Sequence, residues 1–370
     1  MIFLTWVFIT PLEKQLFSMI YTLNPDLYNA VFGSARSPLS LTDLIMLTHS
    51  VGGDLTIHFL SAIGSLRLAD GVLFGALVPF ISLFVGGFIT GRQHRNYNLT
   101  QRFICALATG LMYAVIIASL SLLANDSFHG KTAALGLHFS LILAFINAFV
   151  FGTLFSLPGL IMKVRPIRLT AVLKQSSLRY GDALHYGIAI FLSGFGVVFI
   201  IALIILIVKG GVIKGALLTL ASSIQLAYYF WALLNFNTGW VSGLFDLTLS
   251  IFGSNSQTLG TGLHTWLLPG LLLSVGLNVY AGKRLAERSE RKLLIALTVY
   301  SLVYSLLMAF TARLSQVSLS ANRFGGINDI FLGIDYLGAG VKTFMFSFVT
   351  AWLGALYQRW FGARDLDDLS

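Results

Sequence analysis

Long apolar runs are the feature that most constrains this chain. Eight of them are long enough, at roughly 17–25 residues, to cross the hydrocarbon core of a bilayer as helices. The runs are 71–91, 103–124, 134–157, 184–208, 215–236, 266–282, 293–312 and 341–359. Composition agrees, because only 11% of the residues are charged, against about 25% in a soluble domain. The sequence therefore predicts an all-α polytopic membrane protein and excludes a soluble or disordered chain.

Basic residues are concentrated in short loops between the runs. By count, 13 of the 24 Lys and Arg residues fall in 92–102, 163–179 and 283–292. Short basic loops stay on the cytoplasmic side of a membrane. We therefore expect these three loops to be cytoplasmic. The net charge of +9 then reflects topology, and no nucleic-acid partner is expected.

This orientation constrains the number of crossings. If 134–157 ends inside and 266–282 begins outside, an odd number of crossings must separate them. The runs 184–208 and 215–236 supply two, and the stretch 237–256 is the candidate for a hidden third. The prediction is thus eight or nine crossings, unless one basic loop is not cytoplasmic.

Three segments between the runs are neither strongly charged nor strongly apolar. They are 38–66, 237–264 and 314–338, where Ser, Thr, Gly and Asn interleave with Leu, Ile and Phe. We expect re-entrant or interfacial segments that close the helices on the outer side, because long loops in a compact protein usually have a role. Residues 2–22, interrupted by Pro11, are expected to form an interfacial helix, and a poor span kinked at Pro11 is the alternative.

The chain also has a possible internal repeat. From Pro79 to Arg102, and again from Pro269 to Lys292, an apolar run leads through a basic loop to the next run. Both basic loops face the same side, so the copies would be parallel. The predicted divisions follow: 1–37, N-terminal helix and loop; 38–162, first bundle; 163–236, basic loop and linking helices; 237–360, second bundle; 361–370, polar tail.

Polar residues within the runs are the first candidates for function. They are His138, Asn147, Gln225 and Asn278. Hydrogen bonds between helices are the expected role for such side chains, and contact with a substrate is the alternative.

A second candidate group lies in segment 38–66. His49, Asp54 and His58 could present metal ligands if the stretch were helical, since Asp54 and His58 would then share a face. Gly52 and Gly53 argue against a regular helix, so an exposed polar loop is the expected structure. The single cysteine, Cys105, cannot form an internal disulfide or a cysteine-based metal site. No cofactor is expected.

One resemblance rests on two stretches, SPLSLTDLIMLTHSVGGDLTIHF and LVPFISLFVGGFITGR. Together they resemble a group of uncharacterised polytopic membrane proteins from Gram-positive bacteria, over about residues 37–160. The resemblance implies a multi-pass protein of the bacterial cytoplasmic membrane. Some members of that group carry an N-terminal zinc ribbon, which a chain with one cysteine cannot build.

Three functional hypotheses follow. The first is a non-enzymatic, permease-like protein whose substrate path lies between the two bundles. The second is a membrane scaffold that binds lipid, a membrane protein or a second copy of itself. The third, an intramembrane enzyme, would need clustered titratable residues, for which the sequence offers only His49, Asp54 and His58.

Overall fold

A computed structural model describes most of the chain. The described residues are 1–23, 25, 29, 39–51, 53–59, 62–69, 73–94, 96–124, 127–129, 133–161, 180–210, 216–242, 247–250, 253–254, 257–287, 292–322 and 330–361. The basic loop 163–179 and the tail 362–370 lie outside them, so the predictions made there are not examined.

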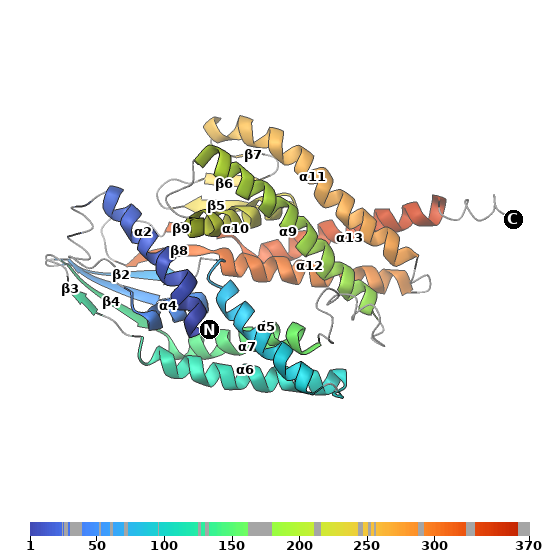
Figure 1. Cartoon of the computed structure of the whole chain (residues 1–370). Coiled ribbons are helices and arrows are strands. Elements are labelled where there is room, and N and C mark those ends of the chain that lie inside the picture. The colour runs from blue at the N-terminus through green and yellow to red at the C-terminus, as the bar shows by residue number, and fades with distance from the viewer. Residues whose placement is uncertain are drawn as a thin grey trace.

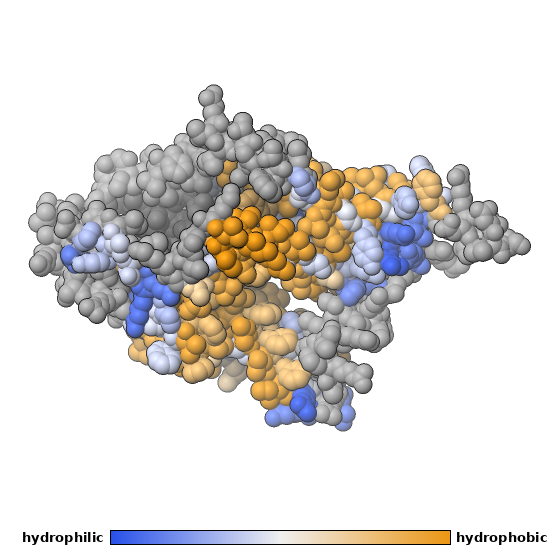
Figure 2. All heavy atoms as spheres, turned by 45° about the horizontal axis from the view of Figure 1, so that its top comes forward, coloured by the Kyte–Doolittle hydropathy of each residue, from blue (hydrophilic) through white to orange (hydrophobic). Residues whose placement is uncertain are grey.

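Each of the eight predicted runs corresponds to a helix. The helices are α5 (Leu77–Gln93), α6 (Leu99–Ser121), α7 (Leu141–Ile161), α9 (Gly181–Gly210), α10 (Ala216–Leu233), α11 (Gln257–Ala286), α12 (Leu293–Ser315) and α13 (Tyr336–Phe361). By length and composition, α6, α7, α9, α10, α12 and α13 could cross a membrane. Figure 2 shows hydrophobic side chains over much of the helical surface. The chain is therefore a helical, polytopic membrane protein.

The helices form two groups that extend from one end of the molecule (Figure 1). In the first group, α7 packs against both α5 and α6; in the second, α13 packs against both α11 and α12. Small residues allow these close contacts. A methyl group at Gly87 of α5 would collide with the carbonyl oxygen of Ser156 in α7. A methyl group at Gly282 of α11 would likewise collide with the carbonyl oxygen of Ala351 in α13.

A sheet joins the two groups at that end, which the all-α prediction missed. Its strands are β1 (Gly53–Phe59), β2 (Ala62–Ala69), β3 (Ser127–His129), β4 (Ala133–Phe139), β5 (Gly239–Ser242), β6 (Leu247–Ser250), β7 (Gly253–Ser254), β8 (Val317–Asn322) and β9 (Ile330–Ile334). The order across the sheet is β3-β4-β1-β2-β8-β9-β5-β6-β7, and every printed pairing is antiparallel.

The sheet corrects three predictions. The segments 38–66, 237–264 and 314–338, expected to be re-entrant or interfacial, contribute strands, because pairing between strands satisfies backbone groups that an isolated segment could not. The run 134–157 begins as strand β4 and becomes helical only at Leu141. The stretch 237–256 supplies β5, β6 and β7, so it does not hide a crossing.

Helix α10 begins at the sheet end of the molecule. It follows the end of α9, and Leu217 and Leu220 near its start pack with Ile9 and Phe74, which precedes α5. After its last turn the chain joins strand β5, which pairs with β9 directly before α13. The chain therefore leaves the second group after α10 and reaches the sheet again at β5.

The N-terminal segment also lies at the sheet end. Helices α1 (Ile2–Leu4) and α2 (Thr10–Leu23) are joined by a π-helical turn, η1 (Thr5–Ile9), just before Pro11. Such a turn accommodates a residue that has no backbone N–H. Ile9 is buried with Leu44 of the short helix α4 (Leu41–Thr48) and Ile224 of α10. Leu44 and Ile45 are both buried, so α4 closes the first group at this end.

Candidate functional site

Two short helices, α4 and α10, end in the same way beside a polar cluster. At the end of α4, the N–H of Val51 donates to the carbonyl of Met46 and that of Ser50 to the carbonyl of Leu47. At the end of α10, the N–H of Asn237 donates to Ala232 and that of Phe236 to Leu233. Both turns are Schellman motifs, and each places a residue other than glycine at positive φ: Ser50 at 54° and Phe236 at 62°.

The first of these clusters, the first junction, is centred on His49. Its Nδ1 donates to the carbonyl of Ile45 at 2.6 Å, which leaves Nε2 to accept from the hydroxyl of Tyr113 in α6 at 2.5 Å. This tautomer follows because a carbonyl can only accept. Asn147 of α7 donates from Nδ2 to the carbonyl of Ser50 at 2.7 Å. Burial lowers the pKa of His49 from 6.5 to about 4, so His49 is neutral at physiological pH.

The second junction is centred on Asn235, which is also fully buried. Its Oδ1 accepts from the hydroxyl of Tyr304 in α12 at 2.8 Å and from Ser274 Oγ in α11 at 3.1 Å. Asn237 Nδ2 donates to Thr343 Oγ1 in α13 at 3.0 Å. In both junctions, a polar residue at the end of a short helix binds a tyrosine of the neighbouring long helix.

The second junction continues deeper into its helical group. Asn278 Oδ1 accepts from the hydroxyl of Tyr300 at 2.6 Å, and its Nδ2 donates to the carbonyl of Ser274 at 2.8 Å. In the described part of the chain, three buried polar atoms of these helices find no hydrogen-bond partner: Trp231 Nε1, Asn237 Oδ1 and Ser301 Oγ. Burying such an atom costs free energy of folding unless water or a ligand forms a hydrogen bond with it.

The remaining candidates lie elsewhere. Gln225 joins α10 to the end of α12: its Nε2 donates at 2.8 Å to the carbonyl of Ser315 and at 2.8 Å to the hydroxyl of Tyr229. His138 is exposed and belongs to strand β4, not to a membrane helix as predicted. The four polar candidates of the apolar runs therefore do not line one common cavity.

His49, Asp54 and His58 do not lie in the exposed polar loop that was expected for them, because His49 is buried at the end of α4. Asp54 and His58 belong to strand β1, where the backbone positions of Asp54 and His138 are paired. Four residues of extended strand span about 13 Å, so Asp54 and His58 do not sit one helical turn apart. Among the described residues, no three His, Cys, Asp or Glu residues come together as metal ligands.

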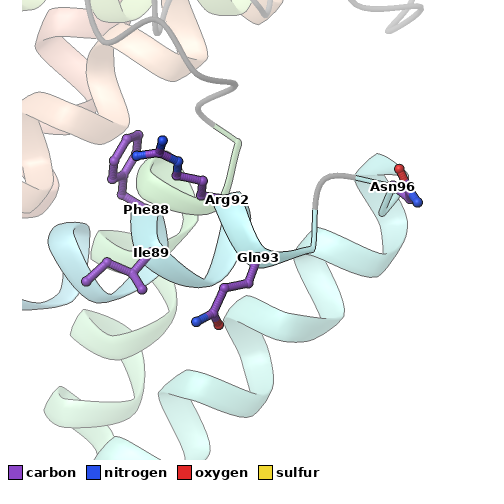
Figure 3. A pocket seen from close by; sticks show the side chains of 5 residues that line it. All are labelled: Phe88, Ile89, Arg92, Gln93 and Asn96. Carbon is purple, nitrogen blue, oxygen red and sulfur yellow. The ribbon is translucent and has the colours of Figure 1, made fainter.

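The opposite, basic end of the molecule has two surface hollows. One, of about 670 Å³, is lined by Phe88, Ile89, Arg92, Gln93 and Asn96 (Figure 3). The other, of about 470 Å³, lies where α12 begins and α13 ends. Arg102 at this end is a structural residue: it is buried and donates to the carbonyls of Tyr97 and Leu160, which ties α6 to α7.

Comparisons with protein-family models, with curated proteins and with solved structures found no match.

Sequence reasoning named His49 and Asn147 of the first junction and Asn278 beside the second. It missed Tyr113, Asn235, Tyr304 and Thr343. Tyrosine is common in apolar runs, and Asn235 lies so close to the end of the run 215–236 that it is interpreted as the polar end of a span. A similarity between the sequences around His49 and Asn235 is the signal that could have revealed the missed residues.

Proposed function

We propose that this chain is a non-enzymatic membrane scaffold built from two parallel units. Unit one runs from α4 to α7 with β1–β4, and unit two runs from α10 to α13 with β5–β9. Four strands of each unit have corresponding places in the sheet, β3-β4-β1-β2 and β8-β9-β5-β6. The shared strand order, the shared helix packing and the two matching junctions support this repeat. It also agrees in direction with the repeat predicted from sequence.

The proposed topology has seven crossings, α5, α6, α7, α9, α11, α12 and α13, with α10 re-entrant. This number replaces the eight or nine expected from hydropathy. It places the basic connections after α5 and after α11 on the same side, which is cytoplasmic by the positive-inside rule. The sheet then lies on the outer side of what we propose is the cytoplasmic membrane of a bacterium.

The observation that carries the scaffold proposal is the pairing of β2 with β8. Five residue pairs, from Ser65 with Asn322 to Ala69 with Ser318, join the two units into one continuous sheet. The outer ends of the units cannot separate without breaking this ladder. A rigid outer platform suits a scaffold, whereas a carrier whose two bundles rock apart on the outer side would have to disrupt it.

A permease-like function is the second candidate, favoured by one observation. The buried polar side chains around Asn235 and Asn278 lie in the second helical group with three atoms left unpaired. Polar atoms of this kind can bind water or a small polar solute within a membrane. Such a path would run inside unit two rather than between the two units.

Distance measurements between the units separate the two candidates. Spin labels at Gln93→Cys in α5 and Thr298→Cys in α12, in a Cys105→Ser background, report the spacing of the units at the basic end. A scaffold should give one narrow distance distribution in nanodiscs. Labels within one group, at Gln93→Cys and Phe103→Cys, give the control width. Two populations whose ratio changes with membrane potential or with added solutes would reject the scaffold in favour of a moving carrier.

A further inference from the structure

The hollow at the end of α5 has a lining that changes from apolar to polar along the helix. Its lining residues are Phe88, Ile89, Arg92, Gln93 and Asn96. Phe88 and Arg92 are one helical turn apart, as are Ile89 and Gln93, and Figure 3 shows the two members of each pair pointing to the same side of α5. Each pair therefore has its apolar member inside the helical group and its polar member at the basic end.

The residues around this hollow place it at the level of lipid headgroups. Arg92 is exposed in the last turn of α5. Ile89, about 5 Å earlier along the helix axis, is 52% exposed. Tyr97 follows in the connection to α6, where it stacks on His94 with the ring centroids 4.7 Å apart. An exposed aliphatic side chain followed by Arg and Tyr is typical of the boundary between hydrocarbon and headgroups.

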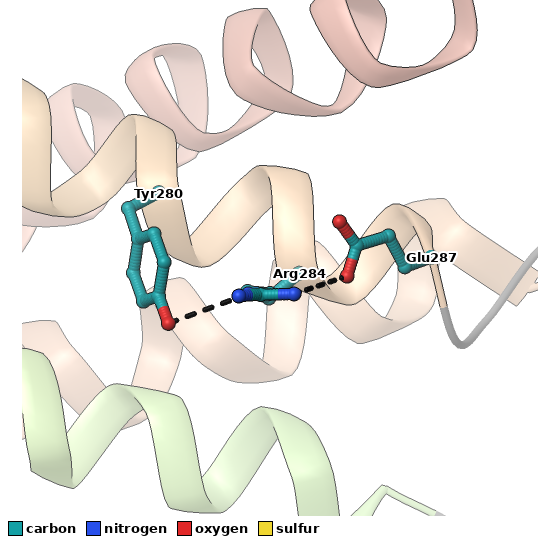
Figure 4. A network of polar contacts seen from close by, with 3 residues as sticks. All are labelled: Tyr280, Arg284 and Glu287. Carbon is teal, nitrogen blue, oxygen red and sulfur yellow. Dashed lines mark hydrogen bonds and ion pairs between the residues drawn. The ribbon is translucent and has the colours of Figure 1, made fainter. Parts of the chain in front are cut away.

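No acidic residue near Arg92 in the sequence offsets its charge. The stretch 92–102 contains three Arg and neither Asp nor Glu, and Arg92 forms no ion pair in the part of the chain that the structure describes. The end of α11 differs. There Arg284 binds Glu287 at 2.9 Å, and its Nε donates to the hydroxyl of Tyr280 at 3.3 Å (Figure 4). Glu287 thereby offsets the charge of Arg284, whereas Arg92 can bind an anion from outside the protein.

We propose that the hollow at the end of α5 binds one anionic phospholipid of the adjoining leaflet. Its phosphate group lies at Arg92, whose guanidinium can donate two parallel hydrogen bonds to it, and an acyl chain follows Phe88 and Ile89.

The ligand class follows from the order of the lining, because apolar, cationic and amide side chains succeed one another as acyl chain, phosphate and headgroup do in a phospholipid. A soluble anion would leave the apolar part uncovered, and a neutral lipid would leave Arg92 without a counter-charge. The proposal needs only that the chain is a membrane protein, so it stands apart from the scaffold hypothesis.

Fluorescence quenching by brominated lipids tests the proposal. The full-length Ile89→Trp variant, whose added indole lies at the hollow, is reconstituted with brominated phosphatidylglycerol or brominated phosphatidylcholine. The quenching of the wild-type protein in the same lipid is subtracted. We expect phosphatidylglycerol to occupy the site on the order of fivefold more strongly, and salt to reduce the preference.

Charge variants in the same background locate the preference. Arg92→Gln should abolish it, and Arg92→Lys, which keeps the charge but not the paired hydrogen bonds, should retain part of it. The matched control is Lys292→Gln, which removes an exposed charge at the other hollow and should leave the preference unchanged.

Four outcomes would overturn the proposal. Equal quenching by the two lipids would mean that no anionic headgroup is selected. An equal loss of preference in Arg92→Gln and Lys292→Gln would assign it to the overall charge of this end. Release of the lipid by millimolar soluble glycerol phosphate would mean that the site takes a free phosphate ester. An added indole inaccessible to both lipids would mean that a second copy of the chain, or another protein, covers the hollow.

Discussion

His49 and Asn235 occupy equivalent positions in the two junctions but differ in their chemistry. Each follows the last turn of a short helix, is fully buried, and binds a tyrosine of a neighbouring long helix. Asparagine has no charge to lose or gain, whereas histidine does. The first junction is therefore sensitive to pH in a way that the second is not.

Acidification should destabilise the first unit through His49. Its pKa is about 4 in the folded protein and 6.5 when unperturbed, so the unfolded chain binds more protons between these values. The contribution of neutral His49 is present above pH 6.5 and is lost as pH falls toward 4. By pH 5 the loss amounts to about 2 kcal/mol. The thermal midpoint in detergent at pH 7.5 and pH 5 measures it.

The control for this prediction is His49→Asn, which copies the residue of the second junction. This variant should show a smaller drop in midpoint between the two pH values than the wild type. An identical drop in both proteins would assign the acid sensitivity to other groups.

At the scale of elements, helix contact depends on a few glycines with little room around them. The Cα of Gly87 faces the backbone of Ser156, so any side chain there would push α5 from α7. The adjacent Gly86 has no atom within 4 Å of where a Cβ would lie. We therefore expect a substitution by alanine to have opposite effects on stability at these two neighbouring glycines.

Gly87→Ala should destabilise the protein by about 1–3 kcal/mol, the usual range for overpacking. Gly86→Ala should be neutral or stabilise it by about 0.5–1 kcal/mol, because alanine favours a helix interior over glycine. Denaturation in mixed micelles compares the two variants. Equal stabilities would show that α5 and α7 do not pack as closely as described.

At the scale of the whole molecule, the two basic connections after α5 and α11 lie away from the sheet. The basic last turns of these two helices are found at one end, and the nine strands lie at the other, where α12 ends with Arg313 (Figure 1). The proposed orientation follows, because Lys and Arg resist translocation.

Cysteine labelling checks this orientation. In a Cys105→Ser background, Gln93→Cys should react with a membrane-impermeant maleimide only after permeabilisation, as should Ser289→Cys in the basic loop 283–292. Trp240→Cys, at an exposed position of β5, should react in intact cells. The reverse pattern would invert the topology and place the sheet in the cytoplasm.

The sequence by itself determined the membrane class, the helices and the basic end of the molecule. These depend on local composition: an apolar run of sufficient length becomes a helix in lipid whichever helices surround it. Asn147 and Gln225 were also recognised as polar residues that bind across helices, since a lone amide in an apolar run needs a partner.

Only the tertiary structure decided the sheet, the contacts of α10 and the composition of the junctions. Strand β1 pairs with β4 about 80 residues later, and β2 pairs with β8 about 250 residues later, so no local pattern could select these partners. Helix α10 is as apolar as a spanning helix, and the chain after it reaches the sheet through the turn at Phe236 and the pairing of β5 with β9. Asn235 and Tyr304 are 69 residues apart; they meet because the fold brings two helices together, which composition does not encode.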